Sequence, residues 1–451
     1  MCGERALAVL HSDHVIEFFR ARHLADDDMH FFRSMAFGVA LTSCVAARAA
    51  AQAPLTWGDV RARFIASNPM LRAGALTIDE SKADEVTANL RPNPDLSIGG
   101  LQWNIAGVPP DSDLGHFQNN TTSVTLGYLW ERDHKRALRR DSAIGATAIA
   151  TSTQADLVRT LVFTLRGAFV SLLEAKAFLA LAQNNLIDYD RVLGISRDRL
   201  QAGDIAQIDL DRLVLQRVQY ESDLQTAIVN VRTAKIQLLQ LMNDRMTAVE
   251  QFDITGPYEF TTMSLPLDQF RQMALLSRPD LRAAMQGIDK AKVDNRLAEA
   301  NGSTDPSFGV TYAWPTSENT VHSIGVGVDI PLRIFDRNQG EKQKTLIDVT
   351  RNQHLADASR AQALADVDSA YATVLSGVAL LQPYKDTYLD QSTRVRDTMT
   401  FSYESGGASL IDFLQSQQDY RTVQIAYVNL IASYLNAVNQ LNLAVGQEVI
   451  P

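Results

Sequence analysis

Several short stretches of the chain alternate apolar residues with small or polar ones, which is the spacing of a β-strand with two different faces. In Ser323–Leu332 the apolar positions are all branched residues, and the residues between them are mainly Ser, Gly and Asp. Ser307–Trp314 alternates in the same way, as do Val124–Trp130 and, less regularly, Leu96–Ile105. The four stretches predict two β-hairpins, each with one apolar face and one small or polar face.

The rest of the chain is rich in Ala, Leu and Gln and predicts helices of very different lengths. Two of them are very long, at about 131–199 and 340–403, and four are shorter, at about 55–90, 205–245, 266–300 and 408–446. In the last helix Tyr420, Tyr427, Tyr434 and Leu441 recur every seven residues. A seven-residue apolar repeat is typical of supercoiled helices, and an ordinary coiled coil would give the same pattern.

The chain repeats its own plan, which is the strongest sign of its organisation. Residues from Leu55 match residues from Leu265 at a constant offset of 210, so that Asn68-Pro69 falls on Arg278-Pro279. A later block matches at an offset of 203. We therefore divide the exported chain into a first repeat at 54–250, an irregular linker at 251–264 and a second repeat at 265–450.

The N-terminal segment has the order of parts found in an export signal. Residues 29–51 begin with a short basic region, continue through an apolar stretch and end in an A-x-A arrangement at Ala49 and Ala51. Residues 1–28 are charged and aperiodic, and we interpret them as an extension before the true start. The alternative is a lipoprotein signal that ends before Cys44, which would then be acylated. Either signal predicts that the protein leaves the cytoplasm.

The composition argues against several classes of function. The 451 residues carry a net charge of −10, whereas binding to nucleic acid requires a basic face. Cys2 and Cys44 are the two cysteines, and no group of Cys, His or acidic residues has the spacing of metal ligands. The sequence contains no nucleophile elbow, phosphate loop or dinucleotide motif. We therefore expect no catalytic residue, no cofactor and no dedicated metal site.

Aromatic residues at the strand ends point to a membrane. Trp and Tyr collect at the interfaces of outer-membrane barrels, whose strands are about 9–11 residues long. The candidate interface residues are Trp103, Tyr128, Trp130, Tyr312 and Trp314. No stretch after residue 54 resembles an apolar helix of about 20 residues, so a membrane segment would have to be built from strands. The alternative is a pair of amphipathic hairpins that pack on the chain's own helices.

Four strands cannot close a barrel, and bare strand edges in lipid would leave backbone amides unpaired at a high free-energy cost. A barrel would therefore have to be shared among identical copies of the chain. Two, three or four copies would supply about 8, 12 or 16 strands, and the pattern itself does not choose among them.

Two motifs beside the strands resemble those of a known family. LRPNPDLSIGG at Leu90–Gly100 leads into the first strand, and IPLRIFDRNQGEKQ at Ile330–Gln343 follows the last. Together with the duplicated layout, they make residues 54–450 similar to the TolC-like outer-membrane efflux protein family, and most similar to its CzcC-like branch, which is associated with heavy-metal export. Members typically have IPLFDRNQGE, whereas this chain inserts Arg333-Ile334 before the phenylalanine.

The resemblance implies a mainly α fold with β, in which each chain has four transmembrane β-strands and long α-helical hairpins. Three chains would form a 12-strand β-barrel in the outer membrane and a 12-helix α-barrel in the periplasm. It further implies a passive export duct, not an enzyme, for metal cations or small toxic compounds. The partners would be outer-membrane lipid, a periplasmic adaptor (a membrane fusion protein) and an inner-membrane RND-type pump. The alternatives are a conduit for type I protein secretion and a periplasmic coiled-coil scaffold without a pore.

The turns after the long helices are candidates for the periplasmic gate and for adaptor docking. Gly203 and the Gly406-Gly407 pair can take the positive φ values that reverse a helix sharply. The residues that the resemblance assigns to this constriction are Asp209, Tyr403, Asp412 and Gln415, with Tyr403 able to tie to Asp209 in the closed state. In three copies Asp412 would form a ring of like charges that attracts cations. The alternative is that Ser409 and Asp412 form an ordinary capping box.

Basic clusters follow the second strand of each hairpin, at His134–Arg140 and Arg333–Lys344. Their functional interpretation is contact with phospholipid headgroups at the periplasmic rim of the barrel. The alternative is that each cluster is simply the solvated start of a long helix.

Overall fold

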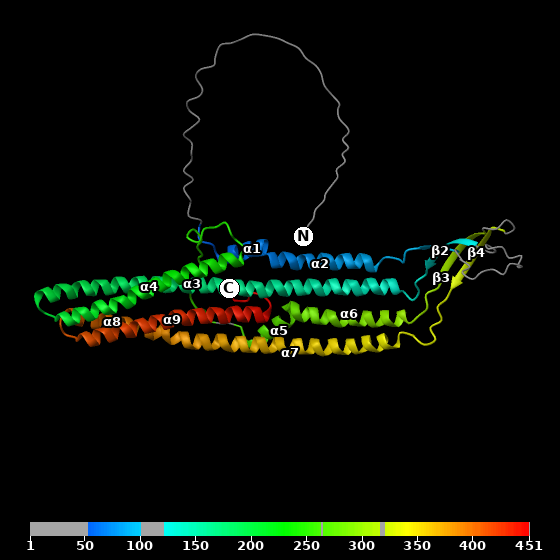
Figure 1. Ribbon diagram of the computed structural model, residues 1–451. Coiled ribbons are helices and arrows are strands. Elements are labelled where there is room, and N and C mark those ends of the chain that lie inside the picture. The colour runs from blue at the N-terminus through cyan, green and yellow to red at the C-terminus, as the bar shows by residue number, and fades with distance from the viewer. Residues whose placement is uncertain (1–52, 101–120, 263–264, 316–320, 451) are drawn as a thin grey trace, which may run out of the picture. The chain divides into compact units, whose positions relative to one another are not determined.

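Long helices lying side by side make up most of the structure, and a small β-sheet lies at one end of them (Figure 1). The computed structural model describes residues 53–100, 121–262, 265–315 and 321–450. The predicted fold class, mainly α with a few strands, is confirmed. Trp103, Cys44 and the predicted export signal lie outside the described residues.

The first half of the chain contains two helices, a β-hairpin and a long helical hairpin. Its elements are α1 (Trp57–Ser67), α2 (Pro69–Ala88), β1 (Asp95–Gly99), β2 (Thr121–Leu129), α3 (Lys135–Ala202) and α4 (Gln207–Leu241). The second half repeats this order as α5 (Leu267–Ser277), α6 (Pro279–Asn301), β3 (Ser307–Pro315), β4 (Ser323–Asp329), α7 (Gln339–Pro383), η1 (Tyr384–Tyr388), α8 (Leu389–Glu404) and α9 (Leu410–Val445).

The predicted helices at 55–90 and 266–300 are each broken in two, which corrects the sequence-based expectation. The breaks fall at Asn68 and Arg278, whose backbones are extended, with φ and ψ of −67° and 122°, and −69° and 119°. Each of these residues precedes a proline, whose ring excludes the helical conformation at the residue before it. The proline then begins the next helix. Its missing N–H costs no hydrogen bond there, because the first N–H groups of a helix have no partner within the helix.

The predicted long helix at 340–403 is also interrupted, at Pro383. A proline inside a helix cannot donate a hydrogen bond to the preceding turn, and its ring crowds the carbonyl there. The chain responds with a π-helical turn at Tyr384–Tyr388 before α8 resumes. The corresponding long helix of the first half, α3, runs for 68 residues without interruption.

The two hairpins join edge to edge into one antiparallel sheet with the strand order β1-β2-β3-β4. The register sets Val124 opposite Tyr312, and Tyr312 opposite Ile324. Because side chains alternate along every strand, this register collects most of the apolar positions on one face. The small positions align on the other face, as in the row Gly127, Gly309 and Gly327.

Three buried apolar clusters hold the helices together, one at the tip of the helical hairpins and two nearer the middle. In the middle cluster of the second half, Val367, Val374 and Leu381 of α7 are fully buried among residues of α5 and α9. Of the predicted heptad in α9, Tyr434 and Leu441 are buried in this cluster. The seven-residue repeat therefore marks helix packing within the chain.

One helical stretch of the described residues, Gln339–Glu404, is long and apolar enough by composition to cross a membrane. This corrects the expectation that no such stretch follows residue 54. Three of its apolar side chains, Val367, Val374 and Leu381, pack against α5 and α9. Leu375 and Leu380 of the same stretch are about half exposed, so packing within the chain covers only part of its apolar surface.

Candidate channel wall and periplasmic entrance

The apolar face of the sheet is not covered by the helices of its own chain. Ile324 and Val326 are 76% and 86% exposed, and Leu96, Leu126 and Val328 are more than half exposed. The alternative of hairpins packed on their own helices is therefore wrong for the described strands. Apolar side chains that their own chain leaves unburied indicate a surface that contacts lipid or another protein.

The opposite face of the sheet is lined by small and hydroxyl-bearing side chains. Thr125 and Thr311 are cross-strand partners, and their hydroxyl oxygens lie 2.8 Å apart. Gly127, Gly309 and Gly327 form a row across three strands. A small, polar inner face is what a water-filled barrel requires, because large side chains would occlude it.

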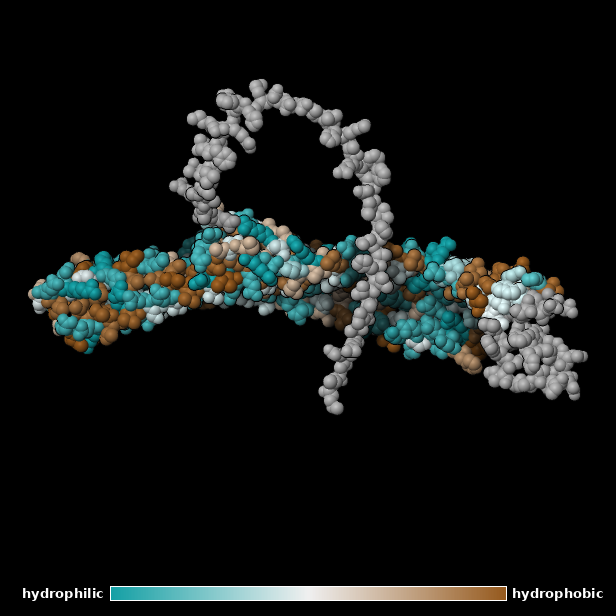
Figure 2. Space-filling view, turned by 45° about the horizontal axis from the view of Figure 1, so that its top comes forward, coloured by the Kyte–Doolittle hydropathy of each residue, from teal (hydrophilic) through white to brown (hydrophobic). Residues whose placement is uncertain are grey.

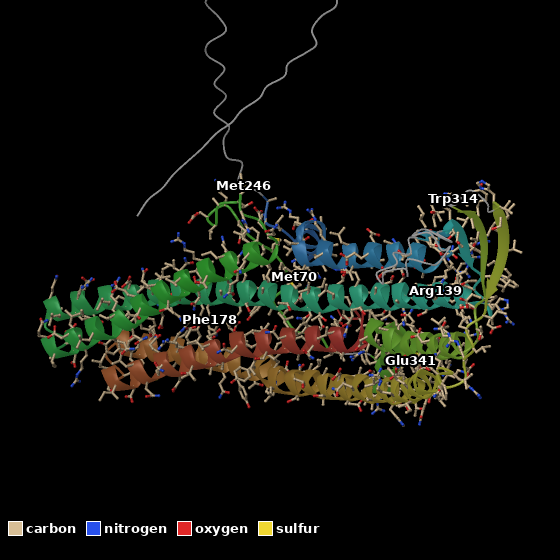
Figure 3. All side chains as sticks on the ribbon, turned by 45° about the vertical axis from the view of Figure 1, so that its right-hand side comes forward. Met70, Arg139, Phe178, Met246, Trp314 and Glu341 are labelled. Carbon is tan, nitrogen blue, oxygen red and sulfur yellow. The ribbon has the colours of Figure 1, made fainter. Side chains whose placement is uncertain are left out.

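Aromatic residues lie at both ends of the apolar face. At the end nearer the helices, Trp130 packs against Phe308 with ring centroids 6.2 Å apart. At the far end, the ring centroids of Tyr312 and Trp314 lie 5.7 Å apart. Trp314 is labelled in Figure 3. Trp130 pairs with Pro306 through its backbone, so Trp314 lies eight residues further along the strand, or about 26 Å. That length is close to the apolar band of about 25 Å in outer-membrane barrels, before strand tilt is allowed for.

The outer edges of β1 and β4 have no strand partner among the described residues. Such edges expose a row of N–H and C=O groups that must be paired in lipid. The sheet of a single chain is thus an incomplete barrel wall.

The sheet is fastened rigidly to the start of α3. Lys135 is 3% exposed, and its Nζ atom lies 2.6 Å from an oxygen of Asp305 and 3.0 Å from the carbonyl oxygen of Ser303. Burial alone would raise the pKa of Asp305, but its hydrogen bonds with Lys135 and Arg132 and the charge of Lys135 hold it below its ordinary value. Both long helices are entered through a residue in the left-handed conformation, His134 or Asn338, residue types that tolerate it better than most.

Many charges in the predicted basic clusters are paired within the chain. Besides Lys135, Arg139 pairs with Glu131 beside the sheet (Figure 3). Lys344 pairs with Glu341 in the first turn of α7. Part of each cluster is therefore neutralised by the chain's own carboxylates, while Arg136 forms no ion pair with a described residue.

At the other end of the helices, two tight turns join α3 to α4 and α8 to α9. Gly203 and Gly406 have φ values of +84° and +77°, which residues with a Cβ atom rarely adopt. Gly407 does not have a positive φ, so its predicted conformation is wrong. A Cβ atom there would come within 3.1 Å of the Ser402 hydroxyl oxygen, so Gly407 serves a close approach instead.

Three of the four residues assigned to the constriction have side chains on the surface of the tip. Asp412 and Gln415 are exposed, and Asp209 is partly exposed with Arg212 at 3.8 Å. The Ser409 hydroxyl accepts a bond from the backbone N–H of Asp412 at 3.2 Å and donates to its carboxylate at 2.7 Å. Ser409 therefore caps α9, but the structure gives no bond between the Ser409 backbone N–H and the Asp412 carboxylate, so the predicted capping box is only half formed.

Tyr403 lies in the interior of the tip instead. Its side chain is 4% exposed and stacks on Phe413 with ring centroids 4.8 Å apart. Its hydroxyl has no hydrogen-bond partner among the described residues, so the predicted tie to Asp209 is not formed within this chain. The neighbouring Tyr189 is buried too, and burial raises the pKa of its hydroxyl.

The two helical hairpins of one chain are also joined by charged contacts that the sequence did not reveal. Arg199 of α3 donates to the carbonyl oxygen of Tyr403 at 2.6 Å. Arg421 of α9 lies 2.5 Å from Asp223 of α4. These partners are about 200 residues apart in sequence, so no local motif could have indicated them.

No cluster of His, Cys, Asp and Glu among the described residues could hold a metal ion.

Comparisons with known proteins point to one class. Residues 270–447 match the outer membrane efflux protein family. The chain is 22% identical over 399 residues to the cobalt-zinc-cadmium resistance protein CzcC of Cupriavidus metallidurans, covering 88% of this chain and 91% of that protein. The solved outer membrane channel CmeC of Campylobacter jejuni aligns with a TM-score of 0.71 and 12% identity, covering 88% and 87% of the two chains. The outer membrane channel MtrE of Neisseria gonorrhoeae, solved in its open state, aligns at 0.68 and 15%, covering 87% and 89%.

The likeness to these solved outer membrane channels shows that this chain has their fold. The family match over residues 270–447 and the similarity to CzcC agree with the predicted resemblance to TolC-like outer membrane efflux proteins and to their CzcC-like branch. The family is one of transport channels.

Proposed function

We propose that three copies of this chain form a passive outer-membrane duct of a tripartite efflux system. The observation that carries the proposal is the sheet, which has an exposed apolar face, a small polar face and two unpaired edges. Pairing β4 of one copy with β1 of the next removes every edge and puts the polar face around water. Three copies supply 12 strands, and their helical hairpins continue the duct into the periplasm.

A periplasmic adaptor and an inner-membrane RND-type pump complete the proposed system. The chain has no recognised site for an energy source, so transport requires a pump elsewhere. The turns at Gly203 and Gly406-Gly407 form the end of the helices away from the sheet, where an adaptor would dock. Metal cations or small toxic compounds are the proposed cargo, and the similarity to a cobalt-zinc-cadmium resistance protein favours metals.

The proposed entrance is a ring of carboxylates at the tip. Asp412 has one oxygen held by Ser409 and is otherwise exposed, and three copies would place three such groups around the axis. Asp209 and Gln415 belong to the same surface, and Tyr403 supports it from the core beneath. Like charges around a narrow pore attract cations and repel anions.

The proposed organisation of the chain follows its sequence. Residues 29–51 would act as the export signal, with 1–28 before the true start, and Cys44 would be acylated only if the lipoprotein signal is used. The two repeats, 54–250 and 265–450, would each supply one hairpin to the barrel and one helical hairpin to the tunnel, with the linker at 251–264 between them.

The test of this function begins with the native protein. It should be extracted from outer membranes as a trimer and should conduct ions in a planar bilayer. Val326→Arg, on the exposed apolar face, should prevent assembly, because a cation facing the bilayer midplane costs about 2–4 kcal/mol. Thr311→Arg, on the opposite face, should still assemble and should reduce cation conductance. A monomer recovered from the soluble periplasm, with no conductance, would refute the duct.

The entrance and the cargo have separate tests. Asp412→Asn in all copies should weaken cation selectivity and block by divalent cations, whereas Asp397→Asn, an exposed carboxylate of α8, should not. Selectivity that survives Asp412→Asn removes this residue from the entrance. A deletion strain should become sensitive to cobalt, zinc or cadmium, and sensitivity to organic drugs alone would reassign the cargo.

A further inference from the structure

A pocket of about 590 Å³ lies where the sheet meets the helices. Its walls come from two chain segments, the link between α2 and β1 and the link between β2 and α3. Arg91 and Pro92 line one side, and Tyr128, Trp130 and the stretch 131–137 line the other. The bond from Arg139 to the carbonyl oxygen of Leu90, at 3.5 Å, holds the two segments together.

The pocket carries a surplus of positive charge. Glu131 is paired with Arg139, and Lys135 is paired with Asp305, so these four charges balance. The remaining lining side chains include three guanidinium groups, Arg91, Arg132 and Arg136, and a single carboxylate, Asp133. None of the three arginines forms an ion pair with any residue that the structure describes. These four side chains, three arginines and one aspartate, thus give the pocket a net charge of +2.

The pocket opens on the lipid side of the sheet, not on the lumen side. Tyr128 and Trp130 line it, and they have the same strand parity as Val124 and Leu126. Alternation along the chain therefore places their rings on the exposed apolar face, the same face as Leu126, which is 54% exposed. A molecule in this pocket would touch arginines at one end and the apolar sheet face at the other.

We propose that this pocket binds the phosphate of a membrane phospholipid whose acyl chains lie along the apolar face of the sheet. Guanidinium groups bind phosphate oxygens through paired, charge-assisted hydrogen bonds. Aromatic rings beside them match the depth of the headgroups in a bilayer. A free phosphate ion would satisfy the arginines but would leave the apolar side of the pocket without a function. The proposal rests on the outer-membrane location of the sheet.

The experiment measures lipid binding to the detergent-solubilised full-length protein by native mass spectrometry. The probes are short-chain phosphatidylglycerol, phosphatidylethanolamine and inorganic phosphate. Arg91→Gln, Arg132→Gln and Arg136→Gln combined should lower the affinity for both lipids by roughly tenfold or more. The matched control changes three exposed arginines of the helices that also lack ion pairs among the described residues, as Arg282→Gln, Arg360→Gln and Arg394→Gln. The control should keep wild-type affinity.

A variant that keeps the positive charges tests whether misfolding causes the loss of lipid affinity. The three arginines changed together to Lys should keep part of the affinity, because an ammonium group still attracts phosphate but cannot form the paired bonds. Unchanged lipid binding in the Gln variant, or an equal loss in the control, would overturn the proposal. Inorganic phosphate that binds as tightly as lipid and displaces it would show an ion site instead.

The same variants separate this inference from the proposed duct. The Gln variant should insert into bilayers and conduct as the native protein does, because the three arginines lie outside the lumen. A native protein that never conducts would refute the duct first. A conducting Gln variant with native lipid affinity would refute the lipid site alone.

Discussion

The two halves of the chain have the same break in their first helix, but different side chains stabilise it. In each, a proline breaks the first helix, and the residue before it contacts the end of the last helix of the same half. Asn68 caps α2 by accepting from the backbone of Met70 and Leu71, and its amide donates to the carbonyl oxygen of Leu241 at 3.4 Å. Arg278 makes the matching contact with the carbonyl oxygen of Ala444 at 3.3 Å.

Arg278 differs from Asn68 in the charges that it brings into the interior. Its side chain is 5% exposed and pairs with Asp280 at 2.6 Å and Asp366 at 2.8 Å. Arg159 of α3 extends this network to Asp280 at 3.6 Å. The backbone position is thus common to both halves, while in the second half the break also ties α6, α7, α9 and α3 together.

The largest effect should come from removing this charge. Arg278→Ala leaves Asp366 without its ion-pair partner and Asp280 with only the more distant Arg159, in a partly buried site. Breaking a buried pair typically destabilises by about 3–5 kcal/mol. Chemical unfolding of the solubilised protein, followed by circular dichroism, measures the change. A loss under about 1 kcal/mol would place the network among ordinary surface ion pairs.

The next effect concerns the two long helices. Pro383→Ala restores a backbone donor in the second-half helix, and a proline inside a helix costs about 3 kcal/mol, so the variant should be more stable by up to that amount. Pro279→Ala is the control, because a proline in the first turn of a helix costs little. Equal changes in the two variants would show that the π-turn does not depend on Pro383.

A smaller effect is expected at the first break. Asn68→Ala removes the side-chain cap of α2, which typically costs about 1 kcal/mol. The same unfolding measurement applies, and Asn68→Asp, which can still accept both backbone bonds, should recover most of the loss. A loss of unfolding free energy as large as that of Arg278→Ala would mean that the two breaks contribute equally to stability.

The smallest expected effect is that of pH on the stability contributed by the Arg278 network. Burial would raise the pKa of Asp280, but bonding and charge from Arg278, with the charge of Arg159, hold it below its ordinary 3.8. A lowered pKa contributes stability that is present above pH 3.8 and is lost as the pH falls toward the folded value. Asp280 is a third exposed, so solvent screening limits the effect. The stability difference between native protein and Arg278→Ala should therefore narrow in acid, and a constant difference would contradict this.

Much of the fold could be predicted from the sequence because it depends on periodicity. The alternation in Ser323–Leu332 requires only that one face differ from the other, and it predicts which residues share a face, although it does not fix the register. The breaks at Asn68 and Arg278 were also within reach, since both precede a proline, but the helical periodicity across them hid the interruption. The turn after Pro383 was missed for the same reason.

The tip shows what periodicity cannot supply. Tyr403 was assigned to the entrance by resemblance, whereas its ring is buried beside Phe413. Which way a tyrosine turns depends on helices far away in sequence, here α3 and α4. The hydrogen bond of Arg199 with Tyr403 and the ion pair of Arg421 with Asp223 have the same origin, so charge spacing along one helix gave no sign of them.

The uncovered sheet has a consequence for how the protein is made. A newly exported chain must cross an aqueous compartment before it reaches its membrane, and a finished sheet with bare edges there would stick to any other strand. The helices need no bilayer and can form early. Strand pairing should therefore be the last step of biogenesis, delayed until neighbouring copies and lipid are both at hand.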